Sequence, residues 1–157
     1  MFKIRFWWML FKALLSRRKI TVGRMGFWVT PFDIDINMHM NNASYLKFMD
    51  LGRWDLILRM GVFRPLFKER LQPAVVHIDI SFKKALWPGT YFNLITEIGG
   101  LSERSFIIKQ KFMVGDKEVA QATVKAVFVQ HGRAMSTEKF RSLLSPEVIS
   151  RFEHLKN

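Results

Sequence analysis

The chain has 157 residues, 49% of them hydrophobic and 14% aromatic, so it can form one domain with a full core and is not a disordered chain. Its 25 lysines and arginines against 13 aspartates and glutamates give a net charge of +12, which favours an anionic partner: nucleic acid, an acidic membrane surface or a phosphorylated ligand. The lack of cysteine excludes thiol catalysis, disulfides and thiolate metal sites, and the four histidines show no metal-ligand spacing.

The first 19 residues combine large apolar side chains with six cations and no acid. Arg5, Lys12 and Lys19 recur every seven residues, so a helix would carry them as one basic stripe. We expect residues 1–19 to form an amphipathic helix on an anionic membrane surface. The alternative is a terminal helix packed on the domain or on a second subunit. A spanning helix is not expected, because Lys12 interrupts a short apolar stretch, and no signal-peptide cleavage site follows.

The next part of the chain predicts one strand and one long helix. Residues 20–30 have the β-branched and aromatic content of a strand, and residues 42–60 have the apolar periodicity of a helix. Gly61 stands where a left-handed residue ends a helix, and Asp55 and Arg59 are spaced to form an ion pair. Because the helix is apolar over most of its circumference, we expect it to be buried, with a sheet wrapped around it.

The remainder of the chain predicts mainly strands. Residues 76–83 alternate, so that Val76, Ile78, Ile80 and Phe82 would share one buried face. Further strands are expected at residues 90–98, 105–114 and 118–130, with turns at residues 87–89, 99–100 and 115–117. Residues 63–71 predict a short helix or loop, and residues 136–156 a helix broken near Pro146. This order predicts an α+β fold, with an antiparallel sheet curled around one helix.

Groups suited to acid, base or hydrogen-bond chemistry are concentrated in residues 33–45, DIDINMHMNNASY. The ordinary explanation is that residues such as Asp33 and Asn41 shape a loop and cap the helix that follows. A calcium loop is excluded, since Met38 stands where glycine is required and Ser44 where a glutamate is required. The chain also lacks the nucleophile elbow of a serine hydrolase. If the protein is an enzyme, its chemistry is expected in this stretch.

Residues 33–53, DIDINMHMNNASYLKFMDLGR, resemble the opening motif of the hotdog-fold thioesterases related to 4-hydroxybenzoyl-CoA thioesterase. The order of the strands and the turn KALWPG at residues 84–89 agree with that family, and the resemblance covers roughly residues 22–132. It implies a hotdog fold, with five or six antiparallel strands wrapped around one long central helix. It also implies hydrolysis of acyl-CoA or acyl-carrier-protein thioesters, by protomers that pair with active sites at their interface.

Carried over residue by residue, the resemblance places Asp35 at the position of the catalytic carboxylate, as the base for a water or as the nucleophile. His39 and Asn41 would orient the water or the substrate. The backbone N–H groups of residues 42–44, at the start of the long helix, would stabilise the oxyanion, and Tyr45 would line the acyl pocket. These substrate-binding residues are Asn42, Ala43, Ser44 and Tyr45.

The motif departs from the family at one position. Many relatives have glycine immediately before the motif histidine, where this chain has Met38, whose side chain can narrow the approach to the carbonyl or change the loop. A hotdog hydratase is disfavoured, because its aspartate and histidine are separated by four residues, whereas three separate Asp35 from His39.

The sequence therefore predicts an acyl thioesterase with three parts: a basic helix at residues 1–19, a hotdog domain at residues 20–133 and a helical extension at residues 134–157. We expect a homodimer or homotetramer in the cytoplasm, attached to the inner face of a membrane by residues 1–19. No cofactor, metal or nucleic acid is expected, since the positive charge follows no reader motif. The alternative is a non-catalytic hotdog protein that binds an acyl chain or a lipid.

Overall fold

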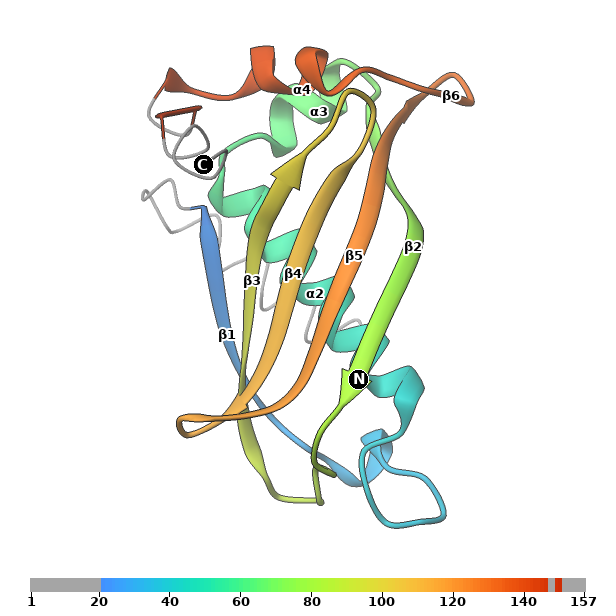
Figure 1. Ribbon diagram of the computed structural model, residues 1–157, viewed down its shortest axis with the longest axis vertical. Helices are drawn as coiled ribbons and strands as arrows, with labels where there is room; N and C mark the ends of the chain where they lie inside the picture. Colours follow the sequence, from blue (N-terminus) through green and yellow to red (C-terminus); the bar gives the residue numbers. More distant parts are fainter. Residues whose placement is uncertain (1–20, 147–148, 151–157) are drawn as a thin grey trace.

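Figure 1 shows the computed structural model of the chain, which describes residues 21–146 and 149–150. In chain order, the elements are β1 (Val22–Trp28), the 3-10 helix η1 (Pro31–Asp33), α2 (Asn42–Arg59), α3 (Phe63–Lys68), β2 (Gln72–Phe82), β3 (Tyr91–Leu101), β4 (Phe106–Val114), β5 (Lys117–Gln130), β6 (Arg133–Ala134) and α4 (Thr137–Leu143). The helix predicted at residues 1–19 lies outside the described residues.

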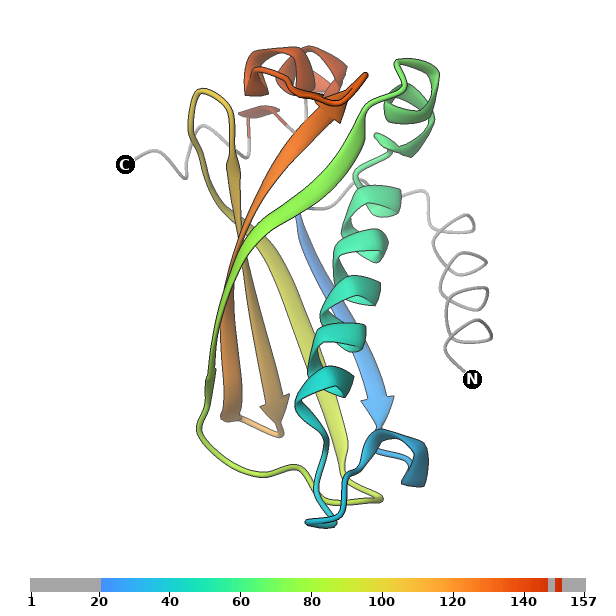
Figure 2. The ribbon, with the colours of Figure 1, turned by 90° about the vertical axis from the view of Figure 1, so that its right-hand side faces the viewer.

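One antiparallel sheet carries all the strands, in the order β1-β3-β4-β5-β2, and the short β6 pairs with β5. The sheet curves, and α2 runs along its concave side (Figures 1 and 2). Residues 115 and 116 connect β4 to β5 as predicted, with Gly115 at a positive φ of 57° that suits glycine. The predicted α+β arrangement, with a sheet curled around one helix, is confirmed.

Helix α2 begins and ends close to where the sequence predicts. Its N-cap is Asn41, and it stops before Gly61, whose φ of 74° is left-handed as expected. The predicted ion pair is also present, since Arg59 Nε lies 2.8 Å from Asp55 Oδ1. The helix is not buried around its whole circumference, however. Leu46 is exposed, because the sheet covers only one side of α2.

The buried face of α2 comes closest to the sheet at Gly52. A methyl group built on Gly52 would lie 2.5 Å from Thr96 Oγ1 and 2.8 Å from Leu94 Cδ2, both on β3. Gln110 of β4 ties the two layers together, since its Nε2 donates to Met49 O at 2.9 Å and to Thr96 Oγ1 at 3.0 Å. The lack of a side chain at Gly52 therefore sets how closely the helix approaches the sheet.

The turn predicted at residues 99–100 is wrong. Gly99 and Gly100 lie inside β3, where the register with β4 shifts between Ile98 and Gly100. The chain turns after β3 instead, where Ser102 N donates to Ser105 O at 2.8 Å. Glycines therefore mark an irregularity within a strand here, a role that sequence alone does not distinguish from a turn.

The predicted buried face of β2 is only partly present. Ile78 and Ile80 are half-buried, whereas Val76 and Phe82 are exposed. The physical reason is that β2 lies at the edge of the described sheet, where β5 is its one partner, and that its register shifts between Val75 and His77. The expectation of one continuous buried face on this strand is corrected accordingly.

The described C-terminal part packs on the end of the sheet opposite the motif. Phe140 of α4 stacks on Phe128 and Phe106, with ring centroids 4.5 and 6.1 Å apart. The helix ends before Pro146, which agrees with the predicted break. Within residues 21–146 and 149–150, no helix has the length and apolarity needed to cross a membrane.

Candidate active site

The motif forms a tight loop between β1 and α2, at the lower end of the molecule in Figure 1. Asp33 is buried, and its Oδ2 accepts hydrogen bonds from Thr30 N at 2.9 Å and from Thr30 Oγ1 at 2.6 Å. Its backbone carbonyl accepts from Asn41 N at 2.8 Å, and Met40 N donates to Leu86 O at 2.7 Å. Asp33 therefore fixes the loop, as the ordinary explanation of this residue predicts.

Asp35 and His39 lie at the two ends of a loop that closes on itself. Asp35 N donates to His39 O at 3.1 Å, which brings the two side chains to one side. Asp35 Oδ1 accepts from Asn37 N at 2.8 Å and lies 3.9 Å from His39 Nδ1, an ion-pair distance rather than a hydrogen bond. Both side chains are partly open to solvent, at 27% for Asp35 and 37% for His39. The carboxylate can therefore meet a water or a ligand.

Met38 stands where the resemblance to the family predicts glycine, and its backbone is left-handed, with φ of 61°. A left-handed conformation costs a residue with a side chain roughly 1–2 kcal/mol. The Met38 side chain is exposed, and its N–H donates to Asp35 O at 3.0 Å. Met38 thus adopts a backbone conformation suited to glycine, which strains the loop. Its side chain points into solvent and does not occupy space inside the loop.

The start of α2 leaves one backbone donor available. Asn41 Oδ1 accepts from Ala43 N at 2.7 Å, and Asn41 O accepts from Ser44 N at 2.8 Å and from Tyr45 N at 3.3 Å. The N–H of Asn42 has no acceptor among the described residues. Asn42 is an exposed residue, and the first turn of α2 holds no acidic residue. Of the donors predicted at residues 42–44, the structure therefore leaves the N–H of Asn42 free.

A depression of about 240 Å3, here named the motif hollow, opens beside the start of α2. Its lining joins the motif to the segment that follows β2, and comprises His39, Met40, Asn42, Tyr45, Phe82, Lys83, Lys84 and Ala85. Of the predicted site residues, His39, Asn42 and Tyr45 line it, whereas Asp35, Asn41, Ala43 and Ser44 do not. Ser44 is buried, and Asn41 acts as the helix cap.

Tyr45 forms the apolar wall of the motif hollow. Its ring packs edge-on against Phe82 and Phe112, at centroid distances of 4.8 and 5.0 Å. Burial raises the pKa of Tyr45 to about 12, so its hydroxyl is neutral at physiological pH. In the same lining, Lys83 pairs with Glu118, whereas the ammonium of Lys84 pairs with no described acid. The hollow therefore combines an apolar wall, a free backbone donor and a cation.

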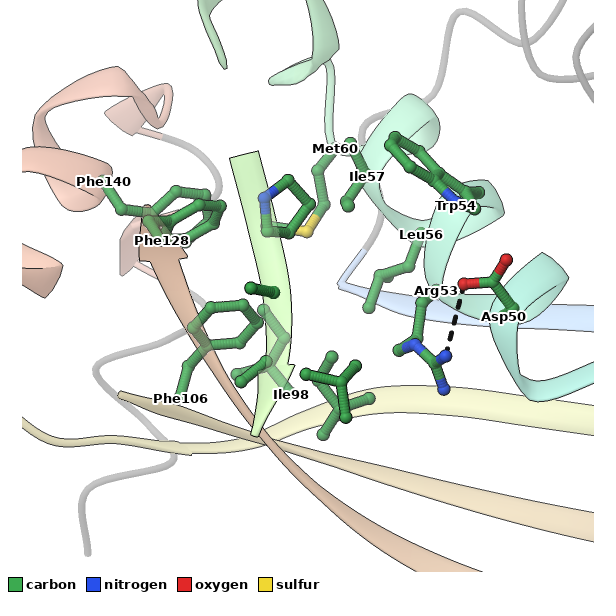
Figure 3. A pocket seen from close by; sticks show the side chains of 15 residues that line it. Asp50, Arg53, Trp54, Leu56, Ile57, Met60, Ile98, Phe106, Phe128 and Phe140 are labelled. Atoms are coloured by element: carbon green, nitrogen blue, oxygen red, sulfur yellow. Dashed lines mark hydrogen bonds and ion pairs between the residues drawn. The ribbon is translucent and has the colours of Figure 1, made fainter. Parts of the chain in front are cut away.

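A second, apolar cavity lies near the other end of α2 (Figure 3). Trp54 and Ile57 of α2, with its C-cap residue Met60, face Phe106, Phe128 and Phe140 across it. The cavity encloses about 70 Å3. Sequence reasoning missed it, because its walls come from six separate elements. Arg53 stands at its edge and donates to Gln110 Oε1 at 3.0 Å and to Asp50 Oδ1 at 3.2 Å. Burial lowers the pKa of Arg53, an effect that Asp50 opposes.

The core between the motif hollow and this cavity is filled. Phe48, Met49 and Phe112 lie there with at most 1% of their surface exposed. Within one protomer, a chain held at the motif hollow therefore has no open path along the inside of α2 to the cavity.

The family model described as "Thioesterase-like superfamily" matches residues 29–152. Two curated relatives match part of the chain. Protein THEM6 of Danio rerio is 33% identical over 81 residues, which cover 52% of this chain and 40% of that protein. "Long-chain acyl-CoA thioesterase FadM" of Escherichia coli (strain K12) is 26% identical over 82 residues, covering 52% and 62% of the two chains. The match spans less than two thirds of each relative's length.

The fold has close counterparts among solved structures. A variant of 4-hydroxybenzoyl CoA thioesterase, solved with 4-hydroxybenzoyl CoA, matches with a TM-score of 0.70 at 14% identity, over 80% of this chain and all of that one. At this identity the likeness concerns the fold alone. It confirms the predicted hotdog arrangement of a curled antiparallel sheet around a helix.

Proposed function

Because the chain belongs to the thioesterase-like superfamily, we propose that it hydrolyses an acyl thioester at the motif hollow, with Asp35 as the catalytic carboxylate. The observation that carries the proposal is the pair of groups that the motif presents ahead of and at the start of α2. Asp35 offers a solvent-accessible carboxylate, and the exposed residue Asn42 offers an N–H without an acceptor among the described residues, on a helix with no acidic residue in its first turn. Thioester hydrolysis needs both parts, one to activate a nucleophile and one to stabilise negative charge on oxygen.

The reaction divides between these groups as follows. The carbonyl oxygen of the thioester accepts a hydrogen bond from the N–H of Asn42, and the positive end of α2 stabilises the charge that develops on it. In one route Asp35 takes a proton from a water that attacks the carbonyl carbon; the C–S bond then breaks, the departing thiolate takes up that proton, and the acyl group leaves as a carboxylic acid. In the other route Asp35 attacks the carbon itself and displaces the thiolate, and a water then hydrolyses the acyl-aspartate anhydride. His39, 3.9 Å from Asp35, orients the attacking group. Asn41 acts indirectly, by capping the helix that presents Asn42.

The substrate we propose is an acyl-CoA, with an acyl-carrier-protein thioester as the other carrier. A relative of this chain is named a long-chain acyl-CoA thioesterase. Lys84 lines the motif hollow without an acidic partner among the described residues, so it can meet a phosphate of the carrier. Tyr45 and Phe82 form the apolar wall against which the first carbons of the acyl chain pack.

The test is release of free thiol from acyl-CoAs of several chain lengths. Asp35→Asn should lower kcat by about 10²- to 10⁴-fold, the usual contribution of a positioned acid or base, without changing the unfolding midpoint. Asp116→Asn, which alters an exposed carboxylate in the hairpin between β4 and β5, is the matched control and should retain full activity. Full activity in Asp35→Asn would show that the carboxylate is misassigned.

A non-catalytic acyl-chain or lipid-binding protein is the second candidate. The strained Met38 and the 3.9 Å separation of Asp35 from His39, longer than a hydrogen bond, favour it. It predicts that acyl-CoA is retained on gel filtration while no thiol is released at any chain length. Thiol release that Asp35→Asn abolishes would exclude it.

We further propose that the protein is a homodimer or homotetramer in the cytoplasm, held at the inner face of a membrane by residues 1–19. The six cations and the absence of acid in that segment support attachment to anionic lipid. Deletion of residues 1–19 should move the protein from the membrane fraction to the soluble fraction. Full-length protein found only in the soluble fraction would contradict membrane attachment.

A further inference from the structure

The end of the molecule that carries the motif also carries large apolar side chains that are open to solvent. Two segments, residues 28–38 and residues 87–91, lie together at the lower end of the molecule in Figures 1 and 2. Their exposed large apolar residues, here named the apolar rim, are Trp28, Phe32, Ile36, Met38, Trp87 and Tyr91. Ile36 keeps 95% of its surface open and Phe32 keeps 78%. Exposed apolar surface gathered at one place marks a site of interaction.

Contacts between the two segments make the rim one surface. Trp28 of β1 is paired with Tyr91 of β3, and their ring centroids lie 5.2 Å apart. Trp87 meets the ring of His39 edge-on at 6.2 Å. The loop itself is held by polar contacts such as the hydrogen bonds of Asp33 to Thr30. The exposed apolar side chains are therefore not what fixes the loop, and their burial against a partner would be favourable.

The charge of the chain suits an anionic lipid surface. Residues 1–19 hold six of the cations and none of the acids, yet the rest of the chain still has 19 lysines and arginines against 13 aspartates and glutamates. Beside the rim, Lys84 pairs with no described acid. The acids within the two rim segments are Asp33, which is buried, and Asp35, whose carboxylate accepts from Asn37 N. The net charge attracts the protein to anionic lipid, and the apolar rim determines which end faces it.

The composition of the rim favours a bilayer over a protein partner. Trp28, Trp87 and Tyr91 have apolar rings with a polar N–H or O–H, the side chains that are enriched where a membrane meets water. Phe32 and Ile36, the two most exposed residues of the rim, are purely apolar and suit the acyl-chain region. A specific protein interface needs a broad and closely complementary surface. Single side chains on loops, separated by polar backbone, are instead accommodated by a fluid interface.

We propose that the apolar rim docks on an anionic lipid bilayer, with Phe32 and Ile36 among the lipid chains, and so holds the motif hollow at the membrane surface. The lining of the hollow comes from residues 39–45 and 82–85, which adjoin the two rim segments in the chain. Docking through the rim therefore brings the mouth of the hollow to the bilayer. This contact is separate from the one proposed for residues 1–19, which would attach the chain without orienting the hollow.

Docking also defines a substrate class, an inference that rests on the proposed thioesterase function. The core between the motif hollow and the cavity of Figure 3 is filled by Phe48, Met49 and Phe112, so one protomer offers a long acyl chain no open path along the inside of α2. A bilayer against the rim supplies the apolar surroundings that the interior does not. The preferred substrate is then a long-chain acyl thioester whose chain stays in the membrane while its carbonyl reaches Asn42 and Asp35.

Site-specific labelling of the full-length protein tests the docking without relying on turnover. The chain has no cysteine, so each introduced cysteine is the only thiol. Phe32→Cys and Phe67→Cys are matched, at positions 78% and 79% exposed, and Phe67 lies on α3, beyond the other end of α2. With an environment-sensitive dye and vesicles of phosphatidylcholine and phosphatidylglycerol, the dye on Phe32→Cys should shift to the blue and be quenched by lipids spin-labelled in their acyl chains. The dye on Phe67→Cys should remain in water.

Three outcomes would overturn the docking. Protein bound to the vesicles with the dye on Phe32→Cys still in water would show that residues 1–19 hold it alone. Protein that stays free of the vesicles would exclude any lipid contact. A blue shift without vesicles that grows with protein concentration would show that a protein surface covers the rim.

Binding and activity of serine variants extend the test. Phe32→Ser with Ile36→Ser should lower the partition coefficient on the same vesicles by about tenfold or more, whereas Phe67→Ser should not change it. The double variant should lose a similar factor in kcat/KM for palmitoyl-CoA presented on vesicles, with hydrolysis of dissolved butyryl-CoA unchanged. Equal losses on both substrates would place these side chains in the site itself and overturn the proposal. If the wild-type protein hydrolyses no acyl-CoA, the thioesterase proposal fails, and the dye on Phe32→Cys still decides whether the rim docks.

Discussion

Replacing Gly52 with alanine should destabilise the protein, although the same change in an exposed helix stabilises it. The substitution gains about 1 kcal/mol of helix propensity. A methyl group at this position would lie 2.5 Å from Thr96 Oγ1 and 2.8 Å from Leu94 Cδ2, so the helix or the sheet must move. Overpacking of this kind costs about 1–3 kcal/mol.

The hydrogen bonds around Thr96 increase that cost. Thr96 Oγ1 accepts the 3.0 Å bond from Gln110 Nε2, and both side chains are buried, so a shift of Thr96 weakens a bond that water cannot replace. A lost hydrogen bond contributes about 1 kcal/mol. The expected net loss in the free energy of unfolding is therefore about 2 kcal/mol, which corresponds to a fall in Tm of about 4–8 °C in a chain of this size.

Guanidinium chloride unfolding, followed by far-ultraviolet circular dichroism, measures this loss as a lower midpoint with an unchanged slope. The matched test is a double-mutant cycle with Thr96→Ala, which removes the nearest clashing atom. Gly52→Ala should cost less in the Thr96→Ala background than in the wild type. An increase in stability on Gly52→Ala alone would refute the reasoning that the close approach of α2 to β3 needs glycine.

Three further predictions concern the loop, the ion pair and alkaline pH. Met38→Gly should raise the free energy of unfolding by about 0.5–1 kcal/mol by relieving the left-handed strain, whereas Met38→Ala should not; equal effects would contradict this account. Asp55→Ala should lower the free energy of unfolding, measured in urea, by about 2 kcal/mol. Adding Arg59→Ala should lower it little further, because the two side chains act as a pair; additive losses would contradict this coupling. The pKa of Tyr45 is raised from 10 to about 12 in the folded state, so stability should be full below pH 10 and about 2 kcal/mol lower by pH 12. Tyr45→Phe should remove this loss in unfolding curves taken across the same range.

Features set by neighbouring residues could be predicted from the sequence. The span of α2, its cap at Asn41 and the left-handed Gly61 follow from local preferences, and each is confirmed. The Asp55–Arg59 pair follows from the spacing of one helical turn. The role of Gly99 and Gly100 could not be predicted, because whether glycines turn a chain or bulge a strand depends on the partner strand.

Features set by strand order lay beyond sequence reasoning. The exposure of Val76 depends on β2 lying at the edge of the sheet, which only the pairing of β2 with β5 decides. The motif hollow includes Phe82 and Lys84 for the same reason, because this pairing places the end of β2 beside the start of α2. The two oxygens of Asn41 accept from the N–H groups of residues 43–45, so within residues 42–45 the N–H of Asn42 is left without an acceptor in the described part of the chain. This outcome depends on geometry rather than on composition.

The strand order also determines when the chain can fold during synthesis. Among the described strands, β2 pairs only with β5 and β1 only with β3, so each edge strand must wait for a partner made much later. Until Gln130 has left the ribosome, β2 has no complete ladder and its apolar residues remain exposed. Pairings of such long sequence separation slow folding and expose nascent chains to aggregation. Production of this protein should therefore depend strongly on temperature and on chaperone supply, and less on the stability of the finished fold.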